Sequence, residues 1–131
     1  MRIAHALLLV PLLVPTACGQ AAASTVDSND DFDCATTFSF FHELAKAQSS
    51  PDRQQQALFI ANQWYALKWN DQHPGESAEQ KNGRAAAIVS AMIKNPLDYK
   101  EVLKACSERA AADPHFINFA TLMRERFPND R

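Results

Sequence analysis

Glycine is scarce in this sequence, so the catalytic signatures that are built on glycine are missing. The chain of 131 residues contains three glycines, and only Gly75 and Gly83 lie beyond the N-terminal segment. Neither can complete the G-x-S-x-G turn of a serine nucleophile or the glycine-rich loop that cradles a phosphate. Strand-like alternation is also missing. We therefore expect no enzyme of these kinds and no β-sheet.

Metal-ligand spacing and basic clusters are missing as well. His42, His73 and His115 fall on separate segments, where they cannot ligate one ion together. Four aspartates gather in one stretch, namely Asp27, Asp30, Asp31 and Asp33. That stretch lacks the glycine-centred order of a calcium-binding loop. With a net charge of −2, the chain has no general attraction for nucleic-acid phosphates. We expect no metal, no other cofactor and no nucleic-acid partner.

The N-terminal segment has the layout of a secretory signal. A positive start at Arg2 precedes an apolar run over 6–14 and the small residues Ala21 to Ala23. The sequence predicts a signal peptide over 1–23 and a periplasmic or secreted protein. Pro11 and Pro15 interrupt the apolar run, so we expect no transmembrane span.

A second interpretation of the same segment is that it carries a lipid anchor. Thr16 to Gly19 resembles a bacterial lipoprotein box around Cys18, although Pro15 stands where leucine is usual. Lipidation of Cys18 is therefore the alternative to cleavage after Ala23, and it would make the protein a lipoprotein anchored to the cell envelope.

Five segments of helical period follow an acidic, polar stretch. We expect a flexible leader over 24–32 and one helical domain over 33–131. The predicted helices cover 33–48, 51–70, 77–94, 96–112 and 114–127. Their boundaries carry helix-start signals: prolines at 51, 96 and 114, and a capping box from Ser77 to Gln80. The sequence predicts an all-α fold, a single small bundle of about five helices.

Two cysteines remain beyond the predicted signal peptide. Cys34 lies on the apolar stripe of the first helix and Cys106 on that of the fourth, so both should face the core. An exported protein meets oxidising conditions, which favour a disulfide between an even pair. We predict a Cys34–Cys106 disulfide, with two buried free thiols as the alternative.

Aromatic residues concentrate on the second helix. Its apolar positions cover more than half of its circumference, which predicts a central helix packed on several sides. We propose four of its aromatics as a partner surface: Phe59, Trp64, Tyr65 and Trp69. An exposed aromatic patch would mark a protein-binding surface. The alternative is that these side chains are ordinary core residues.

The cysteine pattern resembles that of the small periplasmic acid-stress chaperones of the HdeA type. The likeness rests on Cys34 near the first helix and on the segment from Val102 to Cys106, which a polar stretch and an aromatic-bearing helix follow. The middle helix is longer and the cysteines lie further apart than in that family. The resemblance implies acid-triggered opening that exposes a client-binding apolar surface.

Three functions follow as hypotheses. The first is a non-catalytic exported protein that binds another protein, as a chaperone, inhibitor or immunity factor, through an apolar patch near the second helix. The second is a binder of a small apolar ligand or lipid in an inter-helix cavity. That cavity would be lined by Phe41, Trp64, Met92 and Phe119. The third is a structural envelope component anchored through a lipidated Cys18.

Overall fold

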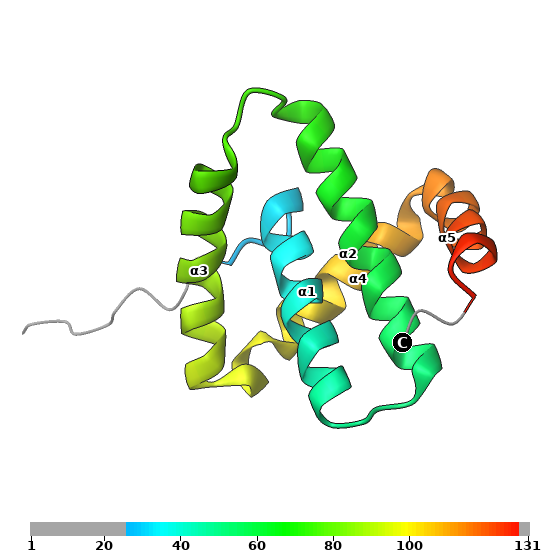
Figure 1. Ribbon diagram of the computed structural model, residues 1–131, viewed down its shortest axis with the longest axis horizontal. Coiled ribbons are helices and arrows are strands. Elements are labelled where there is room, and N and C mark those ends of the chain that lie inside the picture. Colours follow the sequence, from blue (N-terminus) through cyan, green and yellow to red (C-terminus); the bar gives the residue numbers. More distant parts are fainter. Residues whose placement is uncertain (1–25, 129–131) are drawn as a thin grey trace, which may run out of the picture.

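The computed structural model describes residues 26–128, and it confirms the all-α fold and the helical bundle in this range (Figure 1). The elements are α1 (Asp31–Ala47), α2 (Asp52–Gln72), α3 (Ala78–Lys94), the 3-10 helix η1 (Pro96–Tyr99), α4 (Lys100–Ala112) and α5 (Pro114–Arg126). Within residues 26–128, no helix combines the length and the apolar character that a membrane crossing requires. The predicted signal peptide and Cys18 lie outside the described residues.

Helix α1 forms the centre of the bundle. It packs against α2, α3 and α4, while α5 packs against α2 and α4. Figure 1 shows α3 and α5 at opposite edges, with α1 and α2 between them. All residues of α1 from 31 to 38 are buried. The expectation that α2 is the central helix was therefore wrong, because α2 keeps an open face on which Leu67 is 49% exposed.

The predicted starts of α3 and α5 agree with the structure, whereas those marked by Pro51 and Pro96 differ. The capping box joins Ser77 and Gln80 through two hydrogen bonds, of 3.0 and 3.1 Å, and α5 begins at Pro114 as predicted, with Asp113 as its N-cap. Pro51, however, is the N-cap of α2 rather than its first residue, and Pro96 opens η1 rather than α4. These proline signals mark the boundaries correctly to within a few residues.

The turn between α1 and α2 explains the first of these differences. Ser49 adopts the left-handed conformation, with φ of 52°, and the Ser50 amide donates to the Ala45 carbonyl at 2.9 Å. This pattern closes the C-terminus of a helix. Ser50 therefore completes the end of α1, and its side chain does not cap α2.

The start of α1 corrects the prediction of a flexible leader over 24–32 for residues 27–32. Helix α1 begins at Asp31, two residues earlier than expected. The Asp30 side chain accepts from the Asp33 amide at 3.0 Å, and the Asp27 amide donates to the Asp33 carboxylate at 2.9 Å. Residues 27–32 are thus a hydrogen-bonded cap and the first turn of α1. Sequence reasoning treated these aspartates as solvated because their basic partners lie far along the chain.

Candidate functional site

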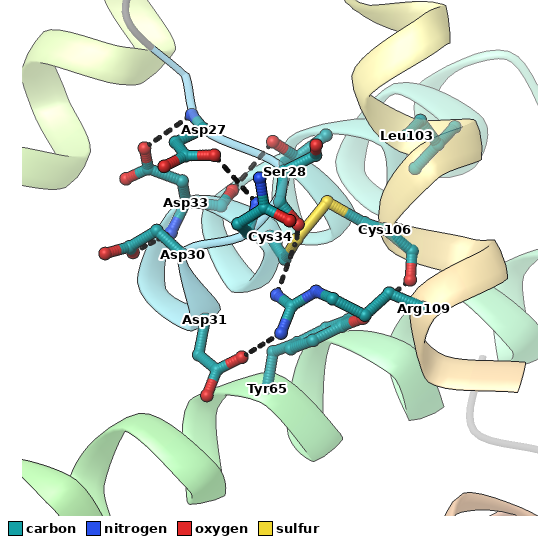
Figure 2. Close-up of a disulfide and its surroundings, with 12 residues drawn as sticks. Asp27, Ser28, Asp30, Asp31, Asp33, Cys34, Tyr65, Leu103, Cys106 and Arg109 are labelled. Carbon is teal, nitrogen blue, oxygen red and sulfur yellow. Dashed lines mark hydrogen bonds and ion pairs between the residues drawn. A yellow bond between two sulfur atoms is a disulfide. The ribbon is translucent and has the colours of Figure 1, made fainter. Parts of the chain in front are cut away.

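The predicted disulfide joins helices α1 and α4. Cys34 and Cys106 are bonded, with their Cα atoms 5.7 Å apart, and neither residue is exposed to solvent. Figure 2 shows the bond running from α1 to α4 above the Tyr65 ring. Phe38 stacks on that ring with the centroids 5.9 Å apart. The disulfide therefore lies in the main apolar cluster of the core.

An ion pair lies directly beside the disulfide. Arg109 of α4 donates to the Asp31 carboxylate at 2.6 Å and to Cys34 Sγ at 3.2 Å. Its guanidinium carbon lies 4.6 Å from the centre of the Tyr65 ring, and Figure 2 shows Arg109 lying beside that ring. We call the Cys34–Cys106 bond and the Asp31–Arg109 pair together the α1–α4 clamp. The clamp fixes the relative position of these two helices.

A second arginine ties α3 to the start of α1. Arg84 lies 2.7 Å from the Asp33 carboxylate and 3.0 Å from that of Asp30. Its guanidinium also stacks over Phe32 and Trp69, at 4.6 and 4.9 Å from the ring centres. Burial alone would lower the pKa of Arg84, but its hydrogen bonds and its attraction to the two carboxylates raise that pKa. Arg84 and Arg109 thus pair with three of the four aspartates in this stretch, namely Asp30, Asp31 and Asp33.

Tyr65 should make the fold sensitive to alkaline pH. Its buried hydroxyl donates to the Cys106 carbonyl at 2.6 Å. Burial raises the pKa of Tyr65 from 10.0 to about 12, although the nearby Arg109 charge opposes this rise. Because the folded pKa lies above the unfolded one, the stability gained by keeping the phenol neutral is fully present below pH 10 and is lost as the pH approaches 12.

This loss should amount to about 2 to 3 kcal/mol of the free energy of unfolding. Rapid-mixing circular dichroism between neutral and alkaline pH would measure it. The matched variant Tyr65→Phe should lose about 1 kcal/mol at neutral pH through the missing hydrogen bond. It should also show a smaller alkaline decline. An identical decline in both proteins would contradict the assignment.

The four aromatics of the predicted partner surface do not form an exposed patch. Tyr65 is fully buried, and Trp69 is 8% exposed. Trp69 packs edge-on against Phe32. Tyr65 and Trp69 therefore belong to the core, which corrects their assignment to a partner surface. Tyr65 contacts α1 and α4, and Trp69 contacts α1 and α3.

The other two aromatics are half-buried beneath the C-terminal part of the chain. Trp64 packs against Phe116 and Phe119 of α5, with ring centres 5.6 and 5.3 Å apart. Phe59 contacts Phe127, with ring centres 6.1 Å apart. They therefore hold α5 and the residue after it against α2. They do not lie beside Tyr65 and Trp69 in one surface.

The cavity predicted from the sequence is also not assembled as expected. Trp64 and Phe119 meet between α2 and α5, whereas Met92 of α3 is completely buried. Phe41 instead lines a groove that involves α4. The four predicted lining residues thus lie at different helix interfaces, and only Phe41 lines the groove described next.

That groove is larger than a second hollow beside it. Its volume is about 710 Å³, and we call it the α1/α4 groove. Its walls come from the end of α1, the start of α2, η1 and α4. They consist of Phe41, Leu44, Ala45, Gln48, Ser50, Gln54, Leu58, Pro96, Leu97, Lys100, Leu103, Lys104 and Ser107. The lining is mainly apolar, with a few polar groups and two lysines.

A smaller hollow adjoins this groove on the side of α5. We call it the inner hollow, and its volume is about 270 Å³. Gln54, Leu58 and Ser107 line both spaces, so the two are contiguous. The inner hollow is otherwise lined by Phe38, Ala57, Ile60, Ala61, Ala110, Phe116 and Arg124. Together the two spaces run from η1 along α4 to α5.

Sequence reasoning missed the groove because its walls come from four elements that are far apart in the chain. The one local sequence signal is that Leu97 directly follows a proline. In the structure, this leucine is 67% exposed. Leu103 lies three residues before Cys106 on α4, and it lines the groove. Neither position alone reveals a concave surface.

Groups that could hold a metal ion do not occur within residues 26–128, where no three histidine, cysteine, aspartate or glutamate side chains converge. The aspartates at the start of α1 face arginines instead. Comparisons of the chain with models of known families, with curated proteins and with solved structures found no match.

Proposed function

We propose that the protein is a non-catalytic binding protein that takes the apolar part of a small ligand into the α1/α4 groove. The carrying observation is the groove itself, whose volume of about 710 Å³ falls within the roughly 300 to 1,000 Å³ typical of ligand pockets. Its lining combines leucines and Phe41 with several polar side chains. Such a composition binds apolar chains and orients them through their polar ends.

This proposal favours the second sequence hypothesis over the first. A protein-binding patch near α2 would need exposed aromatics, yet Tyr65 and Trp69 are buried. We further propose that the protein acts outside the cytoplasm. The Cys34–Cys106 disulfide is compatible with that location, because such bonds persist in oxidising compartments.

A neutral fluorescent probe tests the proposal without assuming a natural ligand. N-phenylnaphthylamine gains fluorescence when it enters an apolar site, and titration should show saturable binding at one site. Leu97→Asp places a charge on the groove wall. We expect this variant to weaken binding about fivefold, which corresponds to about 1 kcal/mol of lost apolar contact.

Leu122→Asp is the matched control for this experiment. Leu122 is 64% exposed, as against 67% for Leu97, and it lines neither the groove nor the inner hollow. Both substitutions should leave the thermal stability nearly unchanged, because both side chains already face solvent. Equal loss of binding in the two variants, or no saturable binding by the parent chain, would refute the proposed function.

A further inference from the structure

We infer that the ligand is a single-chain fatty carboxylate, with its carboxylate at Lys100 and Lys104 and its tail passing Leu58 into the inner hollow. This inference rests on the proposed function and specifies its ligand class. Its three supports are the charge of the groove, the walls that the two spaces share and the size of the inner hollow.

The charge of the groove is positive. Lys100 and Lys104 line it, and no aspartate or glutamate does. The two lysines lie four residues apart on α4, which places them on the same face of the helix. Lys104 lies 3.9 Å from Glu108, but both side chains are about two-thirds exposed, at 66% and 68%. Such a surface pair is weak, so Lys104 can turn to a bound anion.

The walls that the two spaces share give the apolar tail a path. Leu58 lines both of them. The inner hollow is otherwise lined by Phe38, Ile60, Ala61 and other mainly apolar residues. A ligand with a charge at one end and a hydrocarbon tail matches a groove with two lysines beside a mainly apolar hollow.

The size of the inner hollow favours one chain over two. Its volume of about 270 Å³ lies just below the roughly 300 Å³ at which pockets for drug-sized molecules begin. The two acyl chains of a phospholipid would therefore compete for the same space. A single chain can extend from the α1/α4 groove into it.

Arg124 lines the inner hollow and offers another cation there. A carboxylate at Arg124 would reverse the orientation of the ligand, with the tail lying in the α1/α4 groove. The α1/α4 groove, with two lysines, provides the larger positive charge, which favours the first orientation. The variant Arg124→Gln separates these two orientations.

Competition against N-phenylnaphthylamine at low ionic strength provides the test. Dodecanoate and dodecanol share one tail and differ in the charge of the head. We expect dodecanoate to bind about tenfold more tightly than dodecanol, as two surface charge contacts would give. In the Lys100→Gln/Lys104→Gln variant this preference should disappear while dodecanol binds as before. Arg124→Gln should keep the preference.

Each other outcome has a definite meaning. Equal binding of dodecanoate and dodecanol by the parent chain would overturn the inference but leave the proposed function intact. Loss of the preference in Arg124→Gln alone would overturn the assignment of the head to the lysines. Tighter binding of dodecylphosphocholine than of dodecanoate would overturn the carboxylate assignment. Failure of the fluorescent probe itself to bind would remove the proposed function as well.

Discussion

Reduction of the Cys34–Cys106 disulfide should lower the free energy of unfolding by about 4 kcal/mol. The bond joins residues separated by 72 positions, so its removal frees a long loop in the unfolded chain. A domain of this kind has a total stability of about 5 to 15 kcal/mol. Urea unfolding with and without reductant, followed by circular dichroism, would measure the difference.

A matched variant separates the effect of the bond from that of the reductant. The double variant Cys34→Ala/Cys106→Ala should unfold at a lower urea concentration than the oxidised parent, and reductant should not change it further. Because α1 and α4 both line the groove, reduction should also weaken binding of N-phenylnaphthylamine. Coincident unfolding curves for the oxidised and reduced parent would contradict the structural role given to the disulfide.

Replacement of Arg109 by methionine should cost about 3 kcal/mol of stability. The change keeps the apolar stem but removes the charge that pairs with Asp31 at 2.6 Å. The Asp31 side chain is 8% exposed, so its carboxylate would stay buried with the Gln72 amide, at 3.4 Å, as a weaker partner. The stacking of the guanidinium on Tyr65 would be lost too.

A double-mutant cycle isolates the ion pair within this loss. Asp31→Asn combined with Arg109→Met should cost less than the sum of the two single changes, because each single change leaves one charge unpaired and the double variant leaves none. Arg53→Met makes the same chemical change at an exposed position of α2 and should shift the stability by no more than about 0.5 kcal/mol. Additive losses would show that Asp31 and Arg109 do not interact.

The helices and the disulfide could be predicted because local patterns determine them. Helical periodicity placed both cysteines on inward stripes, and the Ser77 capping box marked the start of α3 to the residue. Helix boundaries at Pro51 and Pro96 were less well determined. At these places the end of one helix and the start of the next share a short turn. A proline shows that a helix does not continue through that position, but not which residue starts the next helix.

The pairing of charges could not be predicted, because each pair joins distant parts of the chain. Asp31 and Arg109 are 78 residues apart, and Arg84 and Asp33 are 51 apart. Composition alone therefore made the aspartates appear solvated. The burial of Trp69 was missed for a related reason, since its neighbours Phe32 and Arg84 come from other segments.

The functional hypotheses differ in how the structure bears on them. The inter-helix ligand site is now proposed at a different set of walls, of which Phe41 is the residue retained from the sequence prediction. Lipidation of Cys18 and the resemblance to HdeA-type chaperones stay predictions. The intact mass of the protein purified from its native cell envelope would decide whether cleavage follows Ala23 or a lipid is attached to Cys18.

Methyl-group NMR with dodecanoate tests the central claim that the α1/α4 groove is the ligand site. The methyl groups of Leu44, Leu58 and Leu103 line this groove, and we predict that they shift on titration and saturate together. The chemical shifts of the Leu122 methyl groups on α5 should not change. Shifts confined to α5, or no saturable shift in the groove, would contradict the account.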